Sequence, residues 1–154
     1  MGDGGDPERL ILPEPTHVGF VTHDIKRAMA HLQQYFGIGA FTEMTPDYSN
    51  KRCYGEPEDF QTQLAFARVG NMVYELIQVL RGRTIYQALM KEHGEGIHHL
   101  GYEVSDLARW AMAYKAVGIE PIMSGERIGL KWAYFDTPEI IVELLERTPE
   151  GRVV

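Results

Sequence analysis

The sequence predicts an α+β fold in which two tandem βαβββ modules form one curved, open, eight-stranded, barrel-like sheet with helices outside. Three observations lead to this prediction: a segment that occurs twice, the same succession of strand-like and helix-like segments in each copy, and matching ends. The length of 154 residues suits one compact domain. We expect residues 1–13, rich in Gly and Pro, to be a flexible arm ahead of a single domain over 14–154.

The repeat begins with a His-x-Gly motif, at His17 in the first copy and at His99 in the second. An aspartate follows seven residues after each histidine, and an arginine follows three residues after each aspartate. The copies also end alike, because Glu75 and Glu143 each lie in the middle of an apolar, β-branched run. Matches in the same order and at the same kind of local structure indicate a duplication.

Module one covers about 16–80, and its elements follow from periodicity and from stop signals. An apolar, β-branched strand is followed by a helix that Asp24 can cap, with apolar residues at helical spacing and Gly37 as the end. The Gly70-Asn71 pair predicts a tight hairpin turn. The sequence thus predicts a strand over 16–22, a helix over 24–36, a strand over 38–45, a loop over 46–59 and hairpin strands over 61–69 and 72–80.

Module two, about 96–147, repeats this order after a connecting helix over 84–93 that ends at Gly94. Its first helix has Asp106 as the predicted cap, and Thr137-Pro138 marks the turn of its hairpin. The predicted elements are a strand over 96–104, a helix over 106–117, a strand over 119–124 and hairpin strands over 129–136 and 139–146. Two such units placed side by side leave a cleft to which both halves contribute.

Composition excludes several classes of function. The net charge of −7 argues against nucleic-acid binding, which needs a basic surface. No apolar run is long enough to cross a membrane, and the N-terminus does not resemble a signal peptide. The lone Cys53 excludes an internal disulfide and suits the reducing cytoplasm. The basic pair in Arg81-Gly82-Arg83 is interpreted as a solvated turn, with an anion clamp as the alternative.

The histidines and glutamates of the repeat are the candidates for chemistry. A carboxylate in an apolar strand normally faces solvent, but Glu75 and Glu143 have apolar neighbours on their own face. Burying such carboxylates is costly unless a cation compensates them. Together with His17 and His99, they form a donor set that suits one divalent ion of Co, Ni, Mn, Fe or Zn, with two further coordination positions for substrate. His98 competes with His99, but alternation places the two side chains on opposite faces and only His99 matches His17.

These motifs resemble the vicinal oxygen chelate superfamily, which includes glyoxalase I, methylmalonyl-CoA epimerase, extradiol dioxygenases and bleomycin-binding proteins. The resemblance covers about 16–147 and implies that His17, Glu75, His99 and Glu143 are the metal ligands. The run from Gly94 to His99 is most similar to the methylmalonyl-CoA epimerase branch.

Two departures from that branch stand out. Epimerases often have Gln at the position of Glu75, and some have a second carboxylate on the preceding strand, where Gln63 aligns. The arginine pattern of glutathione-binding glyoxalases is also missing near the first helix.

Gln63, His98, Tyr102 and Tyr134 are predicted to line the substrate pocket.

The resemblance implies a metal-dependent epimerase or isomerase that moves a proton at the carbon next to a carbonyl through a metal-stabilised enolate. Its substrate would be a small molecule with two neighbouring oxygens, such as an acyl-CoA. Glu143 is the first candidate for the base and Glu75 the second; one base can act on one face, or the pair can act on both. Alternatives are a glyoxalase I-like lyase or another enzyme of the superfamily on a non-CoA substrate, a metal-free small-molecule-binding protein and a structural domain. The resemblance also implies a homodimer.

Overall fold

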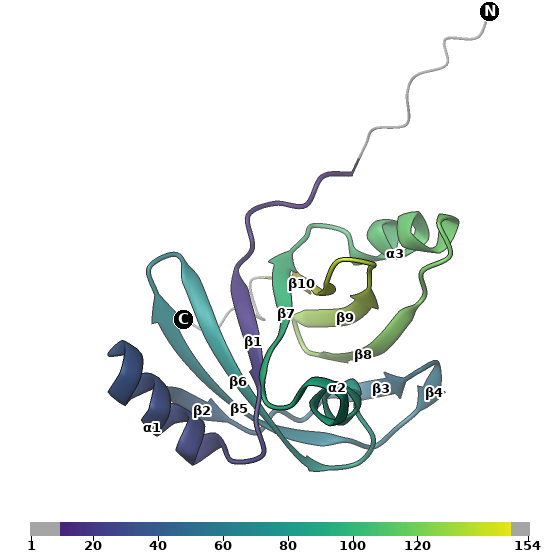
Figure 1. Ribbon diagram of the computed structural model, residues 1–154. Coiled ribbons are helices and arrows are strands. Elements are labelled where there is room, and N and C mark those ends of the chain that lie inside the picture. The colour runs from purple at the N-terminus through teal and green to yellow at the C-terminus, as the bar shows by residue number, and fades with distance from the viewer. Residues whose placement is uncertain (1–9, 149–154) are drawn as a thin grey trace, which may run out of the picture.

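The structure, a computed structural model, describes residues 10–148, and their strands form one ten-stranded sheet. Figure 1 shows this sheet curled into an open half-barrel, with α1 and α3 on its outside. The strands are β1 (His17–Val21), β2 (Thr42–Met44), β3 (Ser49–Cys53), β4 (Glu56–Pro57), β5 (Gln61–Val69), β6 (Met72–Arg81), β7 (Gly96–Glu103), β8 (Pro121–Arg127), β9 (Leu130–Asp136) and β10 (Ile141–Arg147). The helices are α1 (Ile25–Phe36), α2 (Ile85–His93) and α3 (Leu107–Ala116).

The order of the strands reproduces the duplication. It runs β2-β5-β6-β1-β7-β10-β9-β8-β3-β4, so each module contributes four strands on its own side of the β1–β7 pair. β1 is parallel to β6, β7 is parallel to β10, and β1 and β7 are antiparallel where the modules meet. The predicted α+β fold of two modules with outer helices is therefore confirmed.

The segment 46–59, predicted to be a loop, instead contains β3 and β4. β3 pairs with β8 of the other module, and the amide of Tyr54 donates to the carbonyl of Ile122 at 2.8 Å. The edge of β8 offers unpaired backbone groups, and the segment satisfies them although its own side chains are polar. The sheet therefore has two strands more than the eight predicted.

The four predicted helix signals, at Asp24, Gly37, Gly94 and Asp106, lie at helix ends. Asp24 and Asp106 cap α1 and α3, each accepting from the backbone N–H three residues further on. Gly37 ends α1 with a φ of 66°, in the left-handed region that favours glycine. Thr84 and Gln87 form a capping box at the start of α2, which ends before Gly94.

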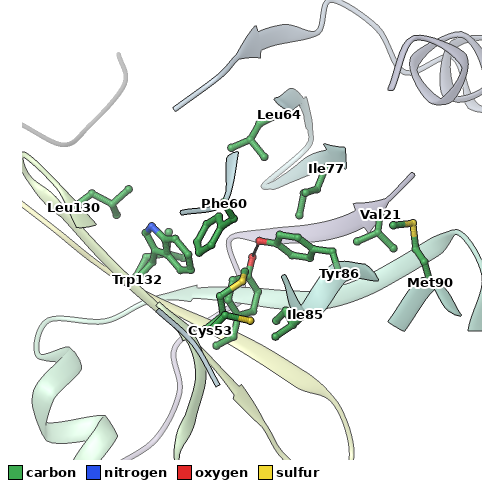
Figure 2. Close-up of a cluster of buried hydrophobic side chains, with 13 residues drawn as sticks. Val21, Cys53, Phe60, Leu64, Ile77, Ile85, Tyr86, Met90, Leu130 and Trp132 are labelled. Atoms are coloured by element: carbon green, nitrogen blue, oxygen red, sulfur yellow. Dashed lines mark hydrogen bonds between the residues drawn. The ribbon is translucent and has the colours of Figure 1, made fainter. Parts of the chain in front are cut away.

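The two faces of the sheet are covered differently. α1 packs on the outer face of module one around Leu76, and α3 packs on the outer face of module two around Leu144. The inner face carries the largest apolar cluster, part of which Figure 2 shows, and α2 contributes Ile85, Tyr86 and Met90 to it. The functional candidates must therefore fit among tightly packed side chains on this inner face.

Within the described residues, no helix is long and apolar enough to cross a membrane. Most of the predicted N-terminal arm, residues 1–9, lies outside the described residues. Residues 10–13 have no regular secondary structure, and Leu12 packs against the cluster under α3.

Candidate metal centre

Four adjacent strands at the centre of the sheet bring the repeated histidines and glutamates together. In the row across β6, β1 and β7, Glu75, Gly19 and His99 are neighbours. The row across β10, β7 and β1 repeats this order with Glu143, Gly101 and His17. Each row therefore combines the glutamate of one module with the histidine of the other, because β1 and β7 exchange partners at the module boundary.

The glycine of each His-x-Gly motif makes room for the histidine of the other module. A Cβ atom on Gly19 would overlap the ring of His99, and a Cβ atom on Gly101 would overlap the ring of His17, at separations that real Cβ atoms do not show. Each imidazole thus packs directly against the bare backbone of the neighbouring strand. This reciprocal packing explains why the glycine is repeated together with the histidine.

The donor atoms converge on one point. His17 Nε2 lies 2.8 Å from Glu143 Oε2 and 3.1 Å from His99 Nε2, and His99 Nε2 lies 3.0 Å from Glu143 Oε2. Glu75 is held less closely, with its Oε2 atom 3.9 Å from His17 Nε2. One donor atom from each of the four residues lies within 4.8 Å of the others.

These separations fit a divalent ion. Donors about 2.1 Å from one ion lie about 3.0 Å apart at right angles and about 4.2 Å apart across it. The three short contacts and the 3.9 Å contact lie in this range, and the widest donor pair, within 4.8 Å, would have to move slightly closer to bind one ion. Two imidazoles and two carboxylates form an N and O donor set typical of Co, Ni, Mn, Fe or Zn. The four residues could therefore hold one such ion.

Burial strengthens this assignment. The exposed fractions are 7% for His17, 9% for Glu75, 2% for His99 and 6% for Glu143. Two carboxylates so far from water and so close together repel each other and lose their hydration, which costs several kcal/mol unless positive charge is nearby. A divalent cation at their centre would supply that charge.

This environment shifts the pKa values of the two glutamates in opposite directions. Burial and the negative charge of Glu143 raise the pKa of Glu75 to about 7, although His17 opposes the shift. Burial also favours the neutral form of Glu143, but hydrogen bonds from His17 and His99 outweigh it and lower the pKa of Glu143.

The histidines differ too. Burial alone would lower the pKa of His17, but its hydrogen bond to Glu143 and the two negative charges raise it to about 9. Burial lowers the pKa of His99. Of the two imidazoles, His17 therefore binds a proton more strongly than His99.

The predicted placement of His98 and His99 on opposite faces is wrong. A register shift interrupts the β1–β7 pairing, so that Gly19 pairs with His99 and Phe20 pairs with Ile97. His98 is the extra residue of this irregularity, and alternation of faces fails there. Its Nδ1 atom lies 2.9 Å from Nδ1 of His99, and burial lowers the pKa of His98 to about 3.

Tyr134, one of the predicted pocket residues, lies beside the donor cluster. It pairs with Glu143 across β9 and β10, and its ring meets the ring of His99 edge-on at a centroid distance of 4.8 Å. Its hydroxyl contacts the hydroxyl of Tyr86 at 2.7 Å. Burial keeps both phenols protonated by raising their pKa values.

Two other predicted pocket residues lie on the wrong face of the sheet. Gln63 donates to Glu43 on the side covered by α1, because the hairpin register pairs Phe66, and not Gln63, with Glu75. Tyr102 packs in the cluster under α3, on the face opposite Gly101. Both predictions are corrected, since these side chains point away from the donor cluster.

Tyr48, which precedes β3 in the segment predicted to be a loop, is a residue near the site that was not predicted from the sequence. Its ring packs edge-on against Trp132 at 5.1 Å, and Trp132 in turn packs against Tyr134. Burial, followed by the charges of Glu75 and Glu143, raises the pKa of Tyr48. No local signal marks Tyr48, because β3 reaches the inner face by pairing with the distant β8.

Comparison with known proteins agrees with this architecture. The family model described as the glyoxalase/bleomycin resistance protein/dioxygenase superfamily matches residues 16–135. No curated protein sequence gives a significant match.

Solved structures share the fold at low identity. A hypothetical protein from Bacillus halodurans C-125 is 18% identical, with a TM-score of 0.64 over 91% of this chain and 98% of its own. A Streptomyces coelicolor methylmalonyl-CoA epimerase variant in complex with 2-nitronate-propionyl-CoA is 17% identical, with a TM-score of 0.66 over 90% and 97%. The Mycobacterium tuberculosis methylmalonyl-CoA epimerase is 17% identical, with a TM-score of 0.61 over 93% and 95%. The sheet topology, the paired modules and the family match together show that the chain belongs to the glyoxalase/bleomycin resistance protein/dioxygenase superfamily.

Proposed function

We propose that the protein is a divalent-metal-dependent epimerase or isomerase of the methylmalonyl-CoA epimerase type, which moves a proton at the carbon next to a carbonyl. The observation that carries the proposal is the buried cluster of two imidazoles and two carboxylates, drawn equally from both modules, within 4.8 Å. His17, His99, Glu143 and Glu75 would hold the ion. When bound, it would act as a Lewis acid that stabilises negative charge on the carbonyl oxygen of the substrate.

The proton transfer itself falls to a carboxylate. The sequence favoured Glu143 as the base, with Glu75 second, but the contacts support the reverse order. Glu143 is engaged by both histidines, whereas Glu75 lies 3.9 Å from the nearest histidine nitrogen. A carboxylate held by fewer contacts is freer to turn toward the substrate and accept a carbon-bound proton.

The side chains on the inner face support the proposal that the reacting part of the substrate is bound away from water. Tyr48, Trp132 and Tyr134 form a continuous aromatic wall beside the cluster, and such rings exclude water from an enolate. The Streptomyces coelicolor structure carries an acyl-CoA analogue on the same fold, which supports an acyl-CoA as the first substrate to test. A cytoplasmic location and a homodimer of the 17.5 kDa chain remain part of the proposal.

A glyoxalase I-like lyase, or another enzyme of the superfamily on a non-CoA substrate, is the second candidate. One observation favours it: Gln63, aligned with the second carboxylate of some epimerases, is turned to the outer face. No acid or base can therefore come from that position. A metal-free binding protein has less support, because it has no use for two buried carboxylates at one point.

Proton–deuterium exchange in D₂O tests the proposal. The purified protein, loaded in turn with Co²⁺, Ni²⁺, Mn²⁺, Fe²⁺ or Zn²⁺, is incubated with methylmalonyl-CoA and with a panel of 2-hydroxycarbonyl compounds. We expect metal-dependent exchange at the α carbon of methylmalonyl-CoA. Conversion of a hemithioacetal without thioester exchange would favour the lyase, and metal binding without exchange or conversion of any compound would contradict both.

A further inference from the structure

The irregularity in β7 brings two consecutive histidine side chains into contact. In a regular strand, His98 and His99 would point to opposite faces. The register shift opposite Gly19 and Phe20 instead brings the two rings to a centroid distance of 5.1 Å, nearly at right angles. A donor of the candidate metal centre thus has an imidazole of its own strand as a neighbour.

The contact joins defined atoms of the two rings. His99 directs Nε2 toward His17 and Glu143, and its Nδ1 atom lies 2.9 Å from Nδ1 of His98. A nitrogen that binds a metal presents its lone pair, so the proton of a ligating His99 belongs on Nδ1. His99 must then donate this hydrogen bond, and His98 must accept it through an unprotonated Nδ1.

His98 is held firmly enough to act as a fixed acceptor. Its ring meets Tyr86 at 5.0 Å and Tyr134 at 5.9 Å, both edge-on, and the two tyrosine hydroxyls are bonded to each other. His98 is 5% exposed. Water therefore cannot easily replace its nitrogen as the partner of His99.

The other module has no such arrangement. Thr16 occupies the position before His17 that His98 occupies before His99, and its hydroxyl donates to the carbonyl of Gly101 at 3.3 Å. Among residues 10–148, the hydrogen bonds of the His17 ring all use Nε2. Orientation of the ring through Nδ1 is thus a feature of module two.

We propose that His98 is a positioning residue that fixes the tautomer and orientation of His99 by accepting a hydrogen bond from its Nδ1–H. The inference rests on the proposed metal centre, but it does not depend on the substrate or the reaction. Partners of this kind raise the basicity of a ligating imidazole and hold its ring in line with the ion, and their loss typically weakens metal binding about 10- to 100-fold.

Three substitutions separate the hydrogen bond from packing. In His98→Asn, a side-chain amide atom replaces Nδ1, and its oxygen can accept from His99. In His98→Gln, the amide lies near the former Nε2 and leaves the Nδ1 position to a carbon. His98→Leu fills much of the space without any polar atom. The fold of each variant is checked by circular dichroism and thermal unfolding.

The measurement is the affinity of the metal-free protein for Co²⁺, determined by competition with a chelating dye, together with the visible absorption spectrum of the bound Co²⁺. We expect His98→Asn to bind within a few-fold of wild type with an unchanged spectrum. His98→Gln and His98→Leu should bind about 10- to 100-fold more weakly with a shifted spectrum. If His98→Leu does not fold, the contrast between Asn and Gln decides.

Equal affinity and equal spectra in all variants would overturn the inference, and so would equal losses in Asn and Gln, since packing alone would then explain them. A wild-type protein that binds no Co²⁺ would overturn the proposed metal centre and this inference with it. Normal Co²⁺ binding without proton exchange on any substrate would contradict only the proposed reaction.

Discussion

The two modules place a glutamate at equivalent positions, Glu75 on β6 and Glu143 on β10, yet the pKa values of the two carboxyl groups are shifted in opposite directions. Glu143 accepts contacts of 2.8 and 3.0 Å from both histidines, and these contacts lower its pKa. Glu75 has only a contact of 3.9 Å to His17, and burial raises its pKa. The two copies of the glutamate thus differ in their contacts to the histidines, and their pKa values are shifted in opposite directions.

The modules also differ in what covers the site. Only module one has the segment with β3 and β4, which crosses to pair with β8 of module two. This crossing places Tyr48 against Trp132, beside the donor cluster. The donors are therefore shared equally between the modules, whereas the strand that brings Tyr48 to the site comes from module one alone.

The largest expected effect concerns the two glutamates. If Glu75 is the base, Glu75→Gln should lower metal-dependent α-proton exchange on the order of 10²-fold or more with the metal retained, because an amide cannot accept the proton. Glu143→Gln should mainly weaken metal binding, since it removes the charge that both histidines contact. Exchange rates and metal content of both variants are compared, with Gln63→Ala on the outer face as control.

A Glu75→Gln enzyme with full turnover and bound metal would show that Glu75 is not the base and would favour Glu143 instead. Loss of exchange in both variants, with metal retained in both, would indicate two bases acting on the two faces of the carbon.

The reciprocal glycines predict the next largest effect. Gly19→Ala should displace His99, and Gly101→Ala should displace His17, because the added methyl group overlaps the ring on the neighbouring strand. We expect metal affinity to fall at least about 10-fold in both variants. Gly39→Ala is the matched control, since its methyl group would meet only Gln33 at 3.8 Å. Unchanged metal affinity in either variant would show that the rings do not need the bare backbone.

A smaller effect is expected in the pH dependence of the metal-free protein. The pKa of His17 is raised from 6.5 to about 9, so folding favours its protonated form. This stabilisation is fully present below pH 6.5 and is lost as the pH rises through 9. A shift of this size corresponds to about 3 kcal/mol.

Chelator-treated wild type and His17→Gln should therefore differ in free energy of unfolding by less at pH 9.5 than at pH 6.5. Denaturant unfolding measures this difference at each pH. A difference that stays constant across this range would mean that His17 does not hold the proton.

The sequence revealed the parts of the site that the duplication repeats. The His-x-Gly motifs and the strand glutamates recur in register, so their convergence could be predicted from the pattern alone. The outward orientation of Gln63 could also have been predicted from the sequence. The two-residue Gly70-Asn71 turn pairs Phe66 with Glu75, and this register places Gln63 on the outer face of the sheet. Tyr102 is likewise three residues from His99 on the same strand, an odd spacing that places it on the other face.

Other features depend on contacts between distant parts of the chain. β3 is polar and contains no apolar alternation, and it becomes a strand only because the edge of β8 lies beside it. The irregularity at His98 arises where β1 and β7 pair across the module boundary, and no turn residue marks it. Hence Tyr48 and the contact between His98 and His99 could not be predicted from local sequence.

The central claim is that one divalent ion binds at the point where two histidines and two glutamates from both modules meet. The most direct test is a crystal structure of the Co²⁺-loaded protein with anomalous data collected at the cobalt edge. We expect one strong peak per chain, within about 2.0–2.3 Å of donor atoms of His17, Glu75, His99 and Glu143. No peak at this point, or a peak bound by residues of one module alone, would contradict it.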